Sequence, residues 1–184
     1  MVVAGVIALV TALTACSSGG SSAVDVGFLR DMADHHEQAV RMALIVVEKD
    51  DMSSITRSFA IDVIASQRYE LGVMDTELRE AGKGRGAPGR EVMTWMDMGV
   101  PFAEMPGMAT QASLNELVAA TGASADALFF RLMIEHHRGG IHMATYAREH
   151  GGEQVRDLAQ RIVFAQEKEI REMQRAQSQL DLAA

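Results

Sequence analysis

The feature that most constrains the fold is a pair of segments that occurs twice in the 184-residue chain. DMADHHEQAVRMA at residues 31–43 returns as LMIEHHRGGIHMA at residues 132–144, so that its histidine pair, methionines and final alanine all shift by 101 positions. IASQRYELGVM at residues 64–74 returns as VFAQEKEIREM at residues 163–173, shifted by 99 positions. Because both members of the pair recur at nearly the same spacing, we interpret the chain as a duplicated supersecondary unit.

The repeated unit has the pattern of a helical hairpin. Apolar residues recur at helical spacing, and only three prolines and 5% aromatic residues argue against an all-β fold. Each helix has one apolar face, so two hairpins must pack on each other. The sequence therefore predicts an all-α domain over residues 24–184, a four-helix bundle with hairpin repeats at about 24–81 and 124–182.

The ends of the first two helices follow from local signals. The charged run at residues 48–51 is expected to end the first helix. Ser53 or Ser54 is expected to cap a second helix over about 55–81, by accepting hydrogen bonds from its free N–H groups. The glycine-rich run GKGRGAPGR then breaks the helical pattern.

The two hairpins are joined by a long crossover that is rich in methionine. Residues 91–122 are expected to be irregular apart from a short helical stretch, LNELVAA, that ends at Gly122. Ser124 or Asp126 is expected to cap a long helix that reaches about His150. Gly151 and Gly152 close that helix, and the last one runs over about 154–180.

The repeated residues point to a polar layer across the middle of the bundle. Helices joined by a short turn run antiparallel, so residues equidistant from the turn meet. Each histidine pair should therefore lie beside a glutamine and a glutamate of its partner helix, with methionines one turn away. The candidate ligands are His35, His36, His136, His137, Gln67, Glu70, Gln166, Glu169, Met32, Met42, Met133 and Met143.

Three interpretations of this layer are open on the residues alone. Buried His, Gln and Glu cost stability unless they are paired, so the layer is either a metal site or a hydrogen-bonded network that fixes the register of the helices. Acid–base catalysis is a third interpretation. No nucleophile beside a base stands out, which favours a protein that is not an enzyme, although a metal-bound water would provide one route to catalysis.

The N-terminal sequence predicts a lipid anchor. Residues 1–16, MVVAGVIALVTALTAC, resemble the apolar part of a secretory signal peptide that ends in a bacterial lipobox, although no Lys or Arg precedes the apolar run. In such signals the cysteine, here Cys16, is lipidated. Residues 17–23 then form a flexible Gly/Ser tether. We expect a lipoprotein that works outside the cytoplasm, anchored to the cell membrane.

The net charge argues against one class of partner. The formal charge of -8 argues against nucleic acid as a partner, because phosphate binding requires clustered Lys and Arg. Cys16 is the only cysteine, so the folded domain has neither a disulfide nor a thiolate ligand. Any metal would have to be held by imidazole, carboxylate, amide or thioether groups.

The two paired motifs, together with MPGM at residues 105–108, resemble the domain-of-unknown-function 305 family over nearly all of the chain after the tether. The resemblance implies a ferritin-like four-helix bundle in an extracytoplasmic protein. Some members of that family are linked to copper binding and copper resistance.

The residue types restrict the metal. Thioether and imidazole together favour Cu(I), and imidazole with carboxylate would also hold Cu(II) or, as the alternative, Zn(II). The Glu-x-x-His motif of ferritin-type di-iron sites is absent at the histidine pairs, which argues against oxygen activation at iron. Met105 and Met108 in the crossover have two open interpretations: they bind Cu(I), or they cover the bundle beside the packing anchors Trp95 and Phe102.

Two functions follow from these patterns. The first is a membrane-anchored protein that binds, sequesters or transfers copper through His and Met ligands. The second is a lipid-tethered structural or interaction subunit of a cell-envelope complex, with a polar core that holds no metal and a protein partner in the envelope.

Overall fold

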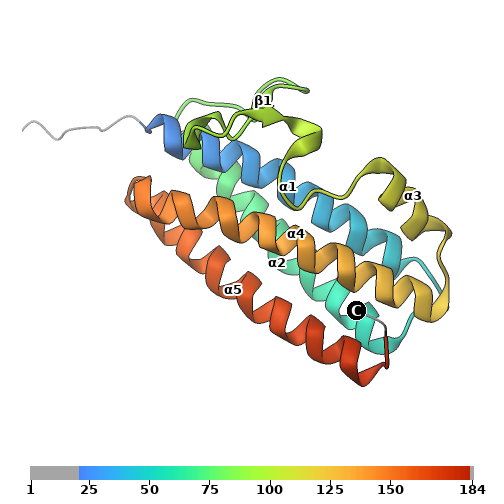
Figure 1. The fold of residues 1–184 in the computed structure, drawn as a ribbon. Coiled ribbons are helices and arrows are strands. Elements are labelled where there is room, and N and C mark those ends of the chain that lie inside the picture. The colour runs from blue at the N-terminus through green and yellow to red at the C-terminus, as the bar shows by residue number, and fades with distance from the viewer. Residues whose placement is uncertain (1–20, 183–184) are drawn as a thin grey trace, which may run out of the picture.

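The computed structural model describes residues 21–182. Within them the all-α prediction is confirmed: four long helices account for most of the chain, and a short fifth helix lies in the crossover (Figure 1). The helices are α1 (Ala23–Val47), α2 (Ser54–Glu80), α3 (Gln111–Ala119), α4 (Gly122–His150) and α5 (Glu153–Gln179).

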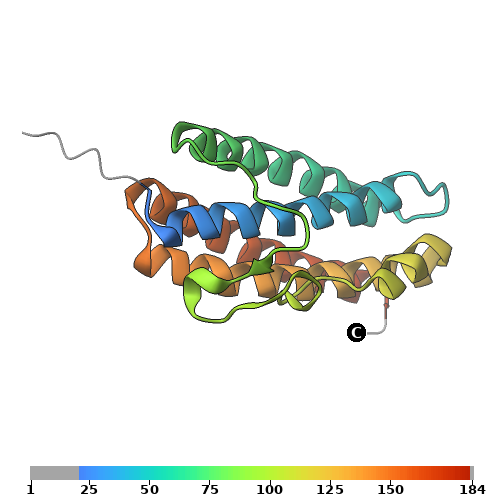
Figure 2. The same ribbon diagram turned by 90° about the horizontal axis from the view of Figure 1, so that it is seen from above.

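The long helices form two hairpins. α1 packs along α2, α4 packs along α5, and the hairpins meet mainly through α1 and α4. Ser53 caps α2 as predicted, because its hydroxyl accepts the backbone N–H of Thr56 at 3.1 Å. The two hairpins lie side by side in both views of the ribbon, with their short turns at opposite ends of the bundle (Figures 1 and 2).

The predicted cap of the third long helix, Ser124 or Asp126, is wrong, because the observed N-cap is Thr121 and both residues lie inside the helix. α4 begins at Gly122, which has a φ of 51°, and its N-cap Thr121 makes no side-chain cap bond. Asp126, offered as a cap, lies inside the helix and is buried. Its carboxylate accepts the backbone N–H of Ser53 at 3.3 Å, so it joins the two hairpins instead of capping its own helix.

α1 and α4 run antiparallel, and bonds at both ends fix them. At one end the Asp25 carboxylate accepts the N–H of Gly152 at 2.7 Å, beside the α4–α5 turn. At the other end the Asp51 carboxylate accepts the N–H of Gly122 at 2.7 Å. These two bonds set which residues of α1 and α4 lie at the same level.

The crossover is more ordered than its sequence indicates. β1 (Glu91–Val92) pairs antiparallel with β2 (Val100–Pro101), and 3₁₀ turns follow each strand at Thr94–Met96 and Phe102–Glu104. The segment lies over α1 and α4 (Figure 2). Its anchor is the buried Asp31 carboxylate, which accepts the Met93 N–H at 2.6 Å and the Trp95 indole N–H at 2.8 Å.

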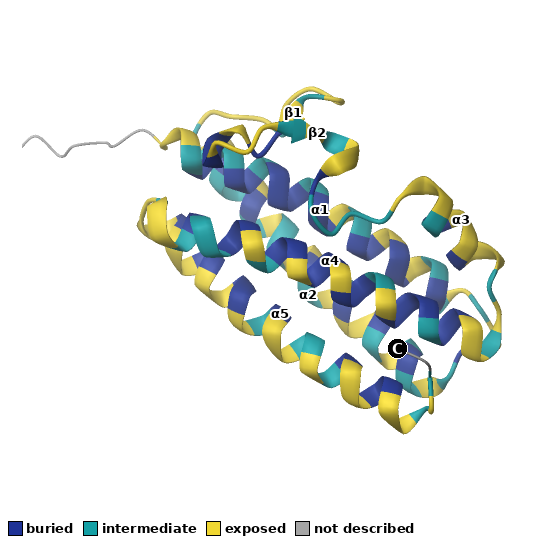
Figure 3. Cartoon of the chain, viewed as in Figure 1, coloured by how far each residue is buried: buried dark blue, intermediate teal, exposed yellow. Residues whose placement is uncertain are grey.

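The core consists of two apolar clusters with a polar layer between them. One cluster, at the end that holds the α4–α5 turn, contains Phe28, Trp95 and Leu158. The other, at the end that holds the α1–α2 turn, contains Val46, Phe129 and Phe130. Buried positions line the inner faces of the long helices (Figure 3). The buried polar side chains midway between the clusters are those of the candidate site.

The N-terminal predictions lie outside the described residues. The signal peptide, Cys16 and most of the tether precede residue 21, so lipidation stays a prediction. No helix within residues 21–182 combines the length and the apolar character that a membrane span requires.

Candidate metal centre

Four histidines lie at the interface between α1 and α4. His35, His36, His136 and His137 are all fully buried. The rings of His35 and His136 stack with their centroids 3.7 Å apart and their planes tilted by 32°. The His136 Nε2 atom also lies 2.9 Å from the His35 carbonyl oxygen. The histidine pairs of the two hairpins thus meet in the middle of the bundle.

Each hairpin adds a carboxylate. His36 Nε2 lies 2.7 Å from Glu70 Oε2, and His137 Nε2 lies 2.7 Å from Glu169 Oε2. A carboxylate that accepts Nε2–H fixes the tautomer of a neutral imidazole and leaves a lone pair on Nδ1. The same arrangement orients histidine ligands around metals in other proteins. The two Nδ1 atoms are therefore the ring positions left available for a ligand.

Several polar atoms of this layer are buried without a hydrogen-bond partner. A buried polar atom left unpaired costs about 1–3 kcal/mol, so a layer that served only as a hydrogen-bonded network would be expected to pair them. The atoms are both ring nitrogens of His35, Nδ1 of His36, His136 and His137, and both amide atoms of Gln67 and Gln166. Among them, unprotonated imidazole nitrogens and the glutamine Oε1 atoms carry lone pairs that a metal ion can use, whereas the glutamine Nε2 atoms carry only N–H groups.

The central histidines are uncharged at neutral pH. Burial lowers the pKa of His35 well below its ordinary value, and the neighbouring His36 and His137 rings act in the same direction. Burial likewise lowers the pKa of His136, with the His35 ring as the next cause. The neutral imidazole is the form that binds metal ions.

The MPGM segment closes the layer on the side of α1 and α4. A Cβ atom at Gly139 would overlap the Pro106 carbonyl, and one at Gly107 would lie 2.7 Å from the Glu135 carbonyl oxygen. Gln38 fixes the end of the segment with two bonds to Ala109: it donates to the carbonyl at 3.0 Å and accepts the N–H at 2.6 Å. The layer can therefore be covered only because glycines allow two backbones to meet.

The predicted methionine ligands flank the layer. Met32 and Met143 belong to the apolar cluster on one side, and Met42 and Met133 to the cluster on the other. In the crossover Met105 is buried, Met108 is half-buried, and both pack against the first cluster. The structure thus brings the His, Gln and Glu candidates to one level and places the methionines above and below it.

The candidate ligands predicted from the sequence did not include two methionines that occupy equivalent positions in the two hairpins. Met74 and Met173 end the second repeated segment and are both fully buried, one in each apolar cluster. Their 99-residue spacing, the same as that of Glu70 and Glu169, was the signal that could have included them.

The side chains of the described residues do not form a metal site built from His, Cys, Asp and Glu ligands alone. Across residues 21–182, no group of three or more His, Cys, Asp or Glu side chains is arranged to hold a metal ion. The layer pairs each carboxylate with one histidine and stacks the other two rings. Its remaining donors are amide groups, with thioethers one turn away, and their chemistry fits a metal that accepts mixed nitrogen and sulfur ligands.

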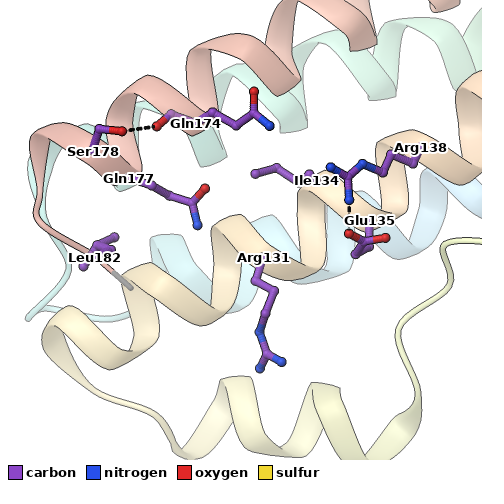
Figure 4. Close-up of a pocket in the computed structure, with 8 residues that line it drawn as sticks. All are labelled: Arg131, Ile134, Glu135, Arg138, Gln174, Gln177, Ser178 and Leu182. Atoms are coloured by element: carbon purple, nitrogen blue, oxygen red, sulfur yellow. Dashed lines mark hydrogen bonds and ion pairs between the residues drawn. The ribbon is translucent and has the colours of Figure 1, made fainter. Parts of the chain in front are cut away.

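A surface groove lies elsewhere, between α4 and α5. It is lined by Arg131, Glu135, Arg138, Gln174, Gln177 and Leu182, among others. Figure 4 shows Arg138 paired with Glu135 and Ser178 donating to the Gln174 carbonyl, at 3.1 Å, while Arg131 points toward α3. None of the candidate ligands lines this groove, so it does not open onto the polar layer.

Fold and site together define a helical-bundle protein with a duplicated His–Glu layer in its core. The chain belongs to the DUF305 family, a domain of unknown function whose model matches residues 25–177. The family resemblance of the repeated motifs is thereby confirmed. No curated protein matches the sequence.

Solved structures share the fold. A DUF305 protein from Streptomyces coelicolor, named as a candidate secreted protein, is 37% identical over 86% of this chain and 94% of its own, with a TM-score of 0.78. A DUF305 fragment from Deinococcus radiodurans is 30% identical over 86% and 98%, with a TM-score of 0.75. CopM in its Cu(I)-bound form is 24% identical over 84% and 96%, with a TM-score of 0.63.

Proposed function

We propose that this protein binds copper outside the cytoplasm, anchored to the membrane through Cys16, and sequesters or transfers the metal. The observation that carries the proposal is the set of unpaired buried nitrogen and oxygen atoms in the histidine layer. Binding a metal would use the lone pairs that the protein leaves without partners, and it would offset the free energy that their burial costs.

The ligand chemistry favours copper over other metals. Neutral imidazoles suit Cu(I), Cu(II) and Zn(II), whereas thioethers are soft ligands that select Cu(I). With methionines on both sides of the layer, a copper ion would find suitable donors in either oxidation state, and zinc is the alternative for the imidazole and carboxylate groups alone.

The comparisons support this choice. CopM, which shares the fold, has been solved in Cu(I)-bound, Cu(II)-bound and silver-bound forms. The relative from S. coelicolor is named as a candidate secreted protein, consistent with a site of action outside the cytoplasm.

The test is a competitive titration of the full chain with Cu(I), under anaerobic conditions and against a chelator of known affinity. The same titration is run on the His36→Ala/His137→Ala variant. We expect stoichiometric copper binding by the parent and a deficit of bound copper in a variant that is still folded. Competition-resistant binding that is equal in both proteins would assign the copper to other groups.

One observation favours a second function, that of a structural or interaction subunit in the cell envelope. The His36–Glu70 and His137–Glu169 bonds are complete without metal and could serve only to fix the register of the helices. This alternative expects a constant protein partner to accompany the chain from membranes, and no change in thermal stability when copper or zinc is added.

A further inference from the structure

Seven methionines of the described residues are fully buried, and all of them except Met93 fall into two sets of three, one set in each apolar cluster. Met32, Met74 and Met143, the first trio, lie in the apolar cluster on one side of the histidine layer. The second trio lies in the cluster on the other side. Its members are Met42, Met133 and Met173.

The hairpin register brings two members of each trio together. The His36–Glu70 bond fixes α1 against α2. Met32 lies four residues before His36, and Met74 lies four residues after Glu70. Because the helices are antiparallel, both methionines lie one turn, about 6 Å, to the same side of that bond.

The second hairpin repeats this arrangement. Met133 lies four residues before His137, and Met173 lies four residues after Glu169. The His137–Glu169 bond again fixes the two helices against each other. The pair therefore lies one turn from the histidine layer, on its other side.

The third member of each trio comes from the opposite hairpin. Asp25 of α1 accepts a hydrogen bond from Gly152 and so fixes the two helices at that level. Met32 lies seven residues after Asp25, and Met143 lies nine residues before Gly152. A difference of two residues is about 3 Å along a helix, so Met143 lies close to the level of Met32. The Asp51–Gly122 bond, nine residues after Met42, fixes the level of the second trio in the same way.

The two trios occupy equivalent positions of the two hairpins. Some other core positions differ between the hairpins, as in Leu29 against Phe130 and Val63 against Ile162. Methionine is kept at all three equivalent positions of the trios, with offsets of 101, 101 and 99. Other buried positions keep a residue without a donor atom, as Phe28 and Phe129 do, whereas the trios keep the side chain that carries a soft sulfur donor.

We propose that each trio binds one Cu(I) ion, or its analogue Ag(I), through three thioether sulfurs. This inference rests on the proposed copper function and assigns Met74 and Met173 a part in it. Neutral soft sulfurs favour Cu(I), and a monovalent ion costs less to bury among apolar residues than a divalent one. Binding is coordination only, since the ion arrives as Cu(I) and no electron is transferred.

The test is a titration of the full chain with Ag(I), followed by NMR of methionine methyl groups labelled with ¹³C. The Met74→Leu/Met173→Leu variant removes one sulfur from each trio and nearly conserves volume. The matched control is Met52→Leu/Met96→Leu, which changes one buried methionine in each cluster outside the trios.

We expect the six trio methyl signals to shift on Ag(I) binding while those of Met52 and Met96 stay in place. The Met74→Leu/Met173→Leu variant should bind two fewer equivalents than the parent, or bind them at least about tenfold more weakly, and the control should match the parent. Each single variant should lose one equivalent, which keeps the test valid if the double variant is unstable.

The outcomes distinguish a failure of the methionine sites from a failure of the proposed copper function. Binding that is intact in the single and double Met variants, with unmoved trio signals, overturns the trio sites and leaves the proposed copper function standing on the histidine layer. A parent that binds neither Ag(I) nor copper overturns both. Loss of binding in the control as well as in the variants overturns the trio sites, because the sulfurs outside them would then matter equally.

Discussion

The two hairpins agree where the histidines lie and differ where the crossover touches them. His36–Glu70 and His137–Glu169 have the same length, 2.7 Å. Two positions after these histidines, by contrast, Gln38 of α1 is aligned with a glycine of α4, Gly139. The glutamine binds the end of the MPGM segment with two hydrogen bonds, and the glycine allows the Pro106 carbonyl to approach.

The difference separates two kinds of requirement. One crossover joins two hairpins, so the residues that receive it cannot be alike on both. The His–Glu pairs face the core and are the same in both hairpins. We infer that their likeness reflects a common chemical role, whereas positions 38 and 139 reflect local packing.

The largest effect on stability is expected at the contact that is found in only one hairpin. Gly139→Val would push its side chain into the Pro106 carbonyl and should lower the free energy of unfolding by about 3 kcal/mol, as overpacking does. Gly72→Val on α2 is the matched control, since a Cβ there meets nothing within 4 Å. Denaturant titration of both variants measures the difference, and equal stabilities would contradict the tight contact.

The next effect comes from the feature that the hairpins share, the buried histidines. The folded-state pKa values of His35 and His136 are lowered, so the unfolded chain binds protons more readily. Their contribution to stability is present above the unfolded pKa of about 6.5 and is lost as the pH falls below it. Between pH 7.5 and 5.5 the loss should reach up to about 1.4 kcal/mol for each ring.

Unfolding free energies across that pH range check this expectation. The His35→Gln/His136→Gln variant removes both rings and should show a flatter profile. An identical pH dependence in the variant and the parent would assign the titration to other groups.

The sign of a third effect distinguishes a metal site from a structural network. Gln67→Leu/Gln166→Leu removes two buried amides whose polar atoms have no partner. Without metal, the variant should be more stable than the parent by about 2 kcal/mol, because unpaired polar groups leave the core. Thermal or chemical unfolding of metal-free protein measures it, and a loss of stability would mean that the amides belong to a hydrogen-bonded network.

The smallest effect concerns the helix starts, which differ in whether a side chain caps them. Ser53 caps α2 with its side chain, whereas Thr121 before α4 makes no such bond. Ser53→Ala should cost about 1 kcal/mol, and Thr121→Ala should cost nothing measurable. Comparing their denaturation midpoints tests both, and equal losses would contradict the difference in capping.

The long helices were predictable because their signals are local. The apolar stripe and the serine before α2 lie within a few residues of the features that they determine. The start of α4 was missed because Asp126 bonds to Ser53, 73 residues away, instead of capping its own helix. The packing of the two hairpins determines that partner, and a cap signal read from neighbouring residues contains no information about this packing.

The candidate site likewise has a part that was predictable from the sequence and a part that was not. The antiparallel register predicted that glutamine and glutamate lie beside the histidines, and the structure has His36 and His137 on the two glutamates. The stacking of His35 on His136 depends on how the hairpins pack, which no spacing within one hairpin determines. The cover formed by Pro106 depends likewise on the path of the crossover.

The most direct test of the central claim, that the histidine layer holds the metal, is electron paramagnetic resonance of the full chain loaded with one equivalent of Cu(II). The measurement reports the nitrogen nuclei around the copper, and His36→Ala/His137→Ala is the comparison. We predict imidazole couplings in the parent that are lost or reduced in the folded variant. A spectrum without imidazole nitrogen, or one that is the same in both proteins, would contradict the claim.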